Sequence, residues 1–272
     1  MKAYYSDRHC DSFVEEEHLR DGCARLQLIF RTWIHFHPAG QYKEDDELWA
    51  VDDWTAEGRS RFKTRFAEVI REGFGDGAIW ILHNQSGVRD VWCDVKIVHE
   101  EERSKAHMCV NALNNPTAIG SAGGYRSNCV RGGESLLGSV FSMNNPIDMS
   151  VTNGVVVGGL VSRTKPVSDA PAPVTFLQNV LLHEFGHYLG LRHFCDWAGE
   201  PNASEQYCAN RTTYEQDDLM AVGNSIRSHH VNPFLSRLGK HEYVPRASCF
   251  GFVANDRQKR PWIGDPNWSW AQ

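Results

Sequence analysis

Eleven consecutive residues contain three histidines and a glutamate: His183-Glu184-Phe185-Gly186-His187-Tyr188-Leu189-Gly190-Leu191-Arg192-His193. On a helix, the four-residue spacing of His183 and His187 places both imidazoles on one face, one turn apart. Such a pair suits two nitrogen ligands of one tetrahedral metal ion. Glu184 lies beside the first histidine, where its carboxylate can reach a water on the metal without becoming a ligand. The stretch therefore predicts a metal site with an acid–base residue next to it.

Residues around this stretch carry helix signals, and they predict one helix from about residue 175 to residue 190. Thr175 and Gln178 have the spacing of a capping box. Gly190 is placed to end the helix in a left-handed turn. A helix that continued past His187 would not bring residue 193 to the same metal ion. The bend at Gly190 is therefore required if His193 is to be the third ligand.

The full pattern, HExxHxxGxxH, resembles the signature of the metzincin zinc metallopeptidases. This resemblance implies one catalytic zinc ion bound by His183, His187 and His193, with Glu184 as the catalytic base. It also implies a tight turn with a methionine beneath the metal site, and Met220 is the candidate for that methionine.

Two features depart from the family pattern and leave the subfamily open. Some metzincins carry a tyrosine two residues after the turn methionine, where this chain has Val222. Phe194, directly after the third histidine, matches no subfamily that can be named. The substrate is open for the same reason.

The sequence upstream of the motif predicts a β-sheet with a helix behind it. Apolar and polar residues alternate over residues 26–36, which is typical of a strand. A helix follows, with Asp53 or Thr55 as its cap and Gly73 as its stop. Shorter strands are predicted at residues 78–82, 91–98 and 154–161, with short apolar pieces at 108–113 and 136–141.

This order of elements, together with the resemblance, predicts an α+β, metzincin-like fold in a single metallopeptidase domain over residues 1–272. The N-terminal lobe, residues 1–193, is expected to hold a mixed sheet, the backing helix and the active-site helix. The C-terminal lobe, residues 194–272, is expected to be smaller and irregular, with the methionine turn and a late helix near residues 233–242.

Eight cysteines without any CxxC pair argue against a zinc ribbon and a thioredoxin-like motif. Disulfides between Cys10 and Cys23 and between Cys195 and Cys208 are the natural local pairings, and buried free thiols are the alternative. The N-terminus has no secretory signal and no recognisable propeptide. The cysteines favour a chain that is secreted or delivered to another cell. The missing signal and propeptide suit an effector or toxin delivered by another machine, or a piece of a longer protein.

Composition and charge limit the kinds of partner that this chain is expected to bind. The net charge is −6 and no basic stripe is present, which argues against a nucleic-acid partner. No apolar stretch is long enough to span a membrane, and a monomer is favoured.

The acidic run at residues 44–47 lacks the spaced oxygen ligands of a calcium loop, so calcium is not indicated. His229 and His230 could form a second metal site, but exposed loop histidines are the preferred interpretation.

The function expected from the motif is hydrolysis of peptide bonds in protein or peptide substrates, with water activated by Glu184 and zinc. An extended substrate would pair with an edge strand, and residues 154–161 and 108–113 are the two candidates. Two alternatives stay open: a zinc hydrolase of a non-peptide amide, and a catalytically silent zinc-binding module. The intact Glu184 argues against the silent module.

Overall fold

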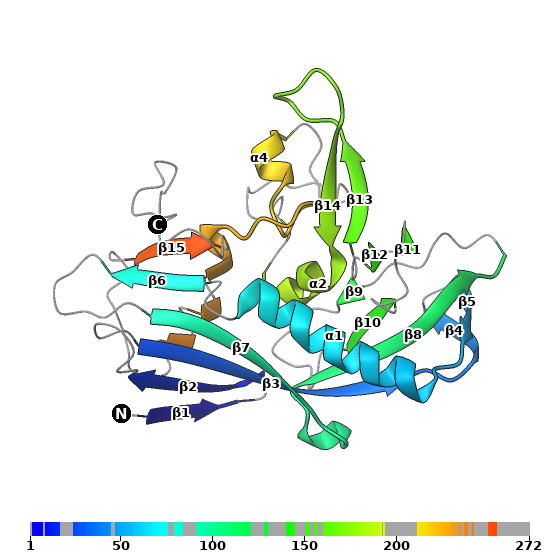
Figure 1. Ribbon diagram of the computed structural model, residues 1–272, viewed down its shortest axis with the longest axis horizontal. Coiled ribbons are helices and arrows are strands. Elements are labelled where there is room, and N and C mark those ends of the chain that lie inside the picture. Colours follow the sequence, from blue (N-terminus) through cyan, green and yellow to red (C-terminus); the bar gives the residue numbers. More distant parts are fainter. Residues whose placement is uncertain are drawn as a thin grey trace. The chain divides into compact units, whose positions relative to one another are not determined.

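The structure is a computed structural model, and its ribbon is drawn in Figure 1. It describes residues 2–7, 9–16, 24–44, 47–75, 79–83, 91–120, 128–129, 140–144, 151–152, 155–156, 160–191, 193, 211–231, 233–234, 237–238, 241 and 250–254. The chain packs into two compact units. The first comprises Met1–Phe30, Arg71–Lys96 and Ile226–Gln272, and the second comprises Arg31–Ile70 and Ile97–Ser225. The lobe boundary expected after His193 stays a prediction.

The first unit is built on antiparallel strand pairs. Its strands are β1 (Lys2–Ser6), β2 (Asp11–Glu16), the first half of β3 (Ala24–Phe36), β6 (Ile79–His83), most of β7 (Val91–His99) and β15 (Phe250–Ala254). β2 pairs with β1 and β3, and β6 pairs with β7 and β15. Along β3 buried and half-buried residues alternate, which confirms the strand predicted at residues 26–36. The strands predicted at residues 78–82 and 91–98 are confirmed as β6 and β7.

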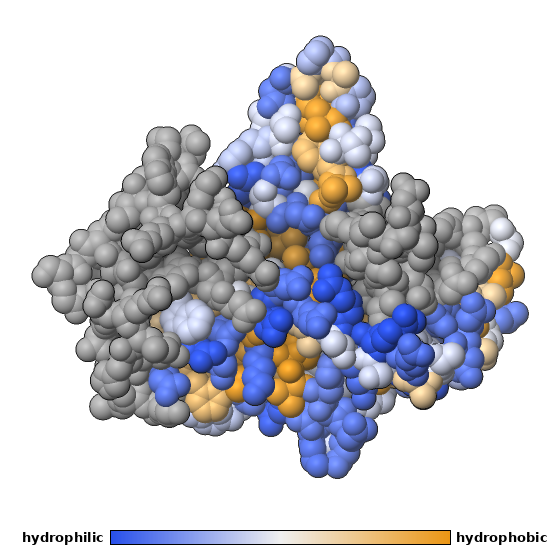
Figure 2. All heavy atoms as spheres, in the orientation of Figure 1, coloured by the Kyte–Doolittle hydropathy of each residue, from blue (hydrophilic) through white to orange (hydrophobic). Residues whose placement is uncertain are grey.

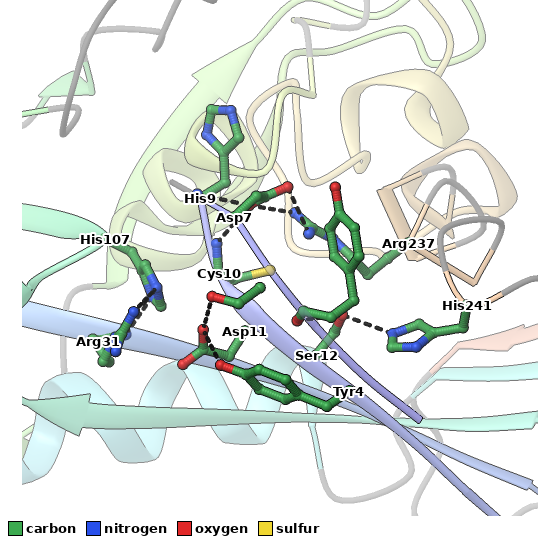
Figure 3. Close-up of polar contacts among 12 residues, drawn as sticks. Tyr4, Asp7, His9, Cys10, Asp11, Ser12, Arg31, His107, Arg237 and His241 are labelled. Carbon is green, nitrogen blue, oxygen red and sulfur yellow. Dashed lines mark hydrogen bonds and ion pairs between the residues drawn. The ribbon is translucent and has the colours of Figure 1, made fainter. Parts of the chain in front are cut away.

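Polar contacts anchor the turn of the β1–β2 hairpin (Figure 3). The Asp7 carboxylate accepts the backbone N–H groups of His9 and Cys10, at 2.8 and 3.2 Å. The Arg237 guanidinium donates to both oxygens of the same carboxylate, at 2.8 and 3.3 Å. Two ends of the sequence are thus joined within the first unit, because these partners are 230 residues apart.

Cys10 follows this turn as a buried free thiol, so the predicted pairing with Cys23 is wrong. Burial raises the pKa of the Cys10 thiol to about 12, which keeps it protonated. Cys93 and Cys109 are also buried free thiols, as the alternative interpretation expected. The pairing predicted for Cys195 and Cys208 lies outside the described residues.

The second unit holds a mixed sheet around one long strand, β8. Its elements are the end of β3, β4 (Gly40–Glu44), β5 (Glu47–Asp52), most of α1 (Ala56–Phe74), η1 (Arg103–Lys105), β8 (Met108–Ala118), β9 (Asn128–Cys129), β10 (Val140–Asn144), β11 (Val151–Thr152), β12 (Val155–Val156), β13 (Leu160–Lys165), β14 (Val174–Asn179), α2 (Val180–Tyr188) and α4 (Thr213–Gln216). β8 is parallel to β3 and β10 and antiparallel to β5. The described elements are therefore α+β with a mixed sheet, as predicted.

Helix α1 lies across this sheet (Figure 1). Thr55 caps it, since its hydroxyl oxygen accepts the Gly58 backbone N–H at 2.9 Å. The ring of Phe62 contacts the rings of Phe36 and Trp54 edge-on, with centroids 5.7 and 5.3 Å apart. The helix continues through the predicted stop at Gly73 and ends at Phe74. The backing helix is otherwise where the sequence predicts it.

Helix α2 (Val180–Tyr188), the predicted active-site helix, is shorter than predicted. Residues 174–179 form strand β14, which pairs with β13 in a two-stranded hairpin, and α2 begins only at Val180. The cap is Asn179, whose side chain accepts the Leu182 backbone N–H at 3.2 Å. Thr175, predicted as the cap, instead bonds the Thr164 hydroxyl across the hairpin at 2.9 Å. The capping box is wrong because residues 174–179 alternate between the two faces of a ribbon.

The β13–β14 hairpin has one buried and one exposed face. Apolar surface runs along it in Figure 2, and Leu177 on its outer face is 53% exposed. Val167, Phe176 and Val222 form a buried cluster beneath it. The predicted strand at residues 154–161 is divided between β12 and the start of β13, and residues 157–159 are not described.

The end of the chain contributes short helical segments. α4 carries a capping box between Thr212 and Glu215. Downstream lies η2 (Ser228–Val231), and residues 233–234 and 237–238 are helical, where the late helix was predicted. Within the described part of the chain, no helix has both the length and the apolar character needed to cross a membrane.

Candidate metal centre

Three histidines predicted as ligands lie together in the second unit. One ring nitrogen from each of His183, His187 and His193 lies within 4.8 Å of the others, and no second group of three such residues occurs among the described residues. The Nε2 atoms of His187 and His193 are 3.1 Å apart. Two nitrogens that bind one tetrahedral zinc ion at about 2.0–2.1 Å lie roughly 3.3–3.4 Å apart. The spacing therefore fits a shared metal ion.

The turn after α2 brings His193 back to the helix. Gly190 has φ +92°, in the left-handed region that favours glycine. Its N–H donates to the His187 carbonyl at 2.9 Å, and the Leu191 N–H donates to the Gly186 carbonyl at 3.0 Å. This pair of bonds is a Schellman motif, which reverses the chain at the end of a helix. The predicted bend is thus confirmed.

Main-chain carbonyls orient two of the rings. The Nδ1 atom of His183 lies 2.7 Å from the Leu219 carbonyl oxygen, and Nδ1 of His187 lies 2.9 Å from that of Leu191. A carbonyl oxygen can only accept, so Nδ1 carries the proton in both rings. Nε2 of each ring is left with its lone pair, as a metal ligand requires.

Burial also keeps His183, the first candidate ligand, uncharged. It lowers the pKa of His183 to about 3, and the neighbouring His187 ring lowers it further. An imidazole with so low a pKa is neutral throughout the physiological range. His183 is therefore available as a nitrogen donor without first losing a proton.

Glu184 and Met220 complete the predicted set. Glu184 lies on α2 directly after His183 and is 8% exposed. Met220 is fully buried, and a Cβ atom on Gly186 would come within 2.5 Å of its sulfur. Helix α2 therefore packs against Met220 through Gly186, which has no side chain.

The turn around Met220 is held by Asp218. The Asp218 carboxylate accepts the Met220 N–H at 2.8 Å, and its carbonyl accepts the Ala221 N–H at 3.0 Å. These bonds make residues 218–221 a tight turn. Val222, where some metzincins have a tyrosine, is buried in the cluster with Val167 and Phe176. It packs against the hairpin and offers no polar group to the site.

Gln178, predicted as part of a capping box, is instead buried on β14 and contacts the site. Its Nε2 atom lies 3.1 Å from Nδ1 of His183 and donates to the Ala221 carbonyl at 2.8 Å. The signal that could have identified it is the alternation of residues 174–179, together with Asn179 directly before the apolar run that starts α2.

Two other site predictions are corrected. The segment at residues 108–113 cannot be the edge that receives a substrate, because β8 is paired on both sides by β3 and β10. His230 is fully buried and its Nδ1 accepts the Arg227 N–H at 2.7 Å, so it is not an exposed loop histidine.

Comparison of the chain with protein-family models, curated proteins and solved structures gives no match. A functional assignment therefore depends on the geometry of His183, His187 and His193. That geometry supports a group of three histidines that could hold one metal ion in an α+β chain.

Proposed function

We propose that the chain is a zinc-dependent endopeptidase of the metzincin type. The observation that carries this proposal is the convergence of three histidine nitrogens within 4.8 Å. Glu184 follows the first of these histidines on α2. Three protein ligands leave one position open on a tetrahedral ion, which is the arrangement of catalytic zinc sites. The buried Met220 beneath α2 supports the same family.

The donor set favours zinc over the hard cations. Calcium and magnesium prefer oxygen ligands, whereas three imidazole nitrogens suit zinc and its transition-metal neighbours. The 3.1 Å distance between Nε2 of His187 and Nε2 of His193 is close to the value for one tetrahedral ion. The two carbonyls that accept from Nδ1 are the outer partners usual for zinc-bound histidine.

A zinc ion in this site would supply a Lewis acid that polarises the scissile carbonyl and makes water more acidic. Glu184 takes the proton from the attacking water and delivers it to the leaving amine. The proton that leaves water thus ends on the new amino group, and Glu184 is regenerated. His183 and His187 do not exchange protons in this scheme, because Leu219 and Leu191 hold their Nδ1–H groups.

The test compares wild-type protein with Glu184→Gln and His193→Ala on an unbiased peptide library. We expect the wild type to cleave and Glu184→Gln to lose about 10²–10⁴-fold in rate while it still binds zinc. His193→Ala should lose most of its zinc affinity. Zinc binding is followed independently by the rise in melting temperature on adding the ion, since a ligand of the native state stabilises it.

Glu102→Gln is the matched control, because Glu102 is an exposed glutamate outside the site. It should cleave and bind zinc as the wild type does. A zinc-loaded wild type that leaves every peptide intact would contradict the peptidase and turn the search to non-peptide amides. Undiminished cleavage by Glu184→Gln would show that another group is the base.

A further inference from the structure

Gln178 is the polar residue of β14 that points into the structure. It is 2% exposed, and it immediately precedes Asn179, the cap of α2. Its side chain contacts three elements besides its own strand: β13, α2 and the turn around Met220. The bonds to Arg163 and Ala221 satisfy the oxygen and the nitrogen of this buried amide, whereas the approach to Nδ1 of His183 is a close contact and not a hydrogen bond, because that nitrogen donates its proton to Leu219. A buried amide is expensive to leave unsatisfied, so the two hydrogen bonds restrict where β13 and the Met220 turn can lie.

The partners also determine which way the amide faces. Its Oε1 atom accepts from Nε of Arg163 at 3.4 Å, and its Nε2 atom donates to the Ala221 carbonyl at 2.8 Å. A guanidinium can only donate and a carbonyl can only accept. The reversed amide would face oxygen with oxygen at Ala221 and nitrogen with a donor at Arg163. The observed orientation is therefore the one that satisfies both partners.

The bond to Ala221 reaches the metal site through the main chain. Ala221 follows Met220, and Leu219 precedes it. The Leu219 carbonyl accepts the Nδ1–H of His183 at 2.7 Å, while the Gln178 amide lies 3.1 Å from the same nitrogen. The amide that holds the Ala221 carbonyl thus also lies against the ring that the Leu219 carbonyl orients.

We propose that Gln178 is a positioning residue for the metal centre, which holds the turn at Met220 so that the Leu219 carbonyl keeps Nε2 of His183 directed at the ion. The inference rests on the proposed function only for the identity of the ion as zinc. Through Gln178, the β13–β14 hairpin then supports the metal site, although none of the hairpin residues is a proposed ligand.

The experiment compares zinc affinity in the wild type, Gln178→Met and Thr175→Val, measured by competition with a chromophoric chelator. Methionine keeps the volume of glutamine but cannot donate to Ala221. Removing an outer partner of a metal ligand typically weakens metal binding about 10–100-fold, and we expect that loss in Gln178→Met. Thr175→Val removes the cross-strand bond on the outer face of the same strand and should keep wild-type affinity.

A spectroscopic measurement separates positioning from a general loss of stability. Cobalt(II) in place of zinc reports ligand geometry through its visible absorption bands. Gln178→Met should change the position or intensity of these bands, and Thr175→Val should not. Wild-type affinity together with wild-type bands in Gln178→Met would overturn the inference, as would equal losses in both variants.

Should Gln178→Met fail to fold, the wild type itself provides the test. The Gln178 side-chain amide protons should exchange with solvent more slowly than those of Gln41, which is exposed on β4. Exchange as fast as that of Gln41 would overturn the inference. A zinc-loaded wild type that cleaves no peptide contradicts the peptidase alone, because affinity and cobalt bands still decide the role of Gln178.

Discussion

The contact between Gly186 and Met220 shows how a residue without a side chain lets helix α2 pack closely against a buried methionine. Gly186 lies between the two histidines of α2, one residue before His187. A glycine inside a helix normally costs about 0.5–1 kcal/mol relative to alanine. Here a Cβ atom would lie 2.5 Å from the Met220 sulfur and 3.5 Å from Leu191. Close packing against the methionine therefore explains the glycine better than helix propensity does.

Gly186→Ala should lower the free energy of unfolding by about 1–3 kcal/mol, because overpacking outweighs the better helix propensity of alanine. The effect is measured by denaturant unfolding of the metal-free protein. Met220→Ala removes the clashing sulfur, so the double variant should be less destabilised than the sum of the single variants. Additive losses would show that Gly186 and Met220 do not contact one another.

The start of α2 is decided by competition between two local signals. Thr175 and Gln178 have the spacing of a capping box, whereas residues 174–179 also alternate as a strand does. The strand prevails because it pairs with β13 and buries Phe176 against Val222. A capping box offers two hydrogen bonds, while the hairpin pairs six residues of β14 with β13 and covers apolar surface.

Asn179→Ala should therefore destabilise the protein by about 1 kcal/mol, since it removes the helix cap. Thr175→Ala should cost less, because it removes only an exposed hydroxyl pair on the hairpin. Thermal and denaturant unfolding of the two variants measure the difference. A larger cost for Thr175→Ala would favour a helix that begins at the earlier residue.

Across the whole molecule, contacts between distant parts of the sequence hold the first unit together, and Asp7 is the clearest case. Burial alone would raise the pKa of its carboxyl, but the bonds and charge of Arg237 and the N–H groups of His9 and Cys10 lower it below the usual 3.8. A carboxyl with a lowered pKa stabilises the folded state when it is ionised.

Asp7→Asn should lower the free energy of unfolding by about 1–2 kcal/mol at neutral pH, as expected for charged hydrogen bonds. The stabilisation is complete above the unfolded pKa, near 3.8, and is lost as the pH falls through the lower folded value. Wild type and variant should therefore converge in stability only below that pH. Glu102→Gln, in an exposed ion pair, is the control and should change stability by less than about 1 kcal/mol. A difference between wild type and Asp7→Asn that persists at low pH would contradict the assignment to ionised Asp7.

Features that depend on residues close together in the chain are predictable from the sequence. The spacing of His183 and His187, the left-handed turn at Gly190 and the alternation along β3 follow from helix, turn and strand geometry. The N-terminal cap of α1 at Thr55 belongs to the same class. For these features, the physical constraint spans a few residues and can be recognised in any chain.

Features that depend on partners distant in the sequence became visible only in the folded chain. The cap at Asn179 depends on the pairing of β14, and the free thiol of Cys10 lies beside a turn bound to Arg237. β8 is paired on both sides rather than at an edge. Gln178 has its role because the Met220 turn, 43 residues further along, comes into contact with it. Such contacts bring together groups far apart in the sequence, and local periodicity carries no information about them.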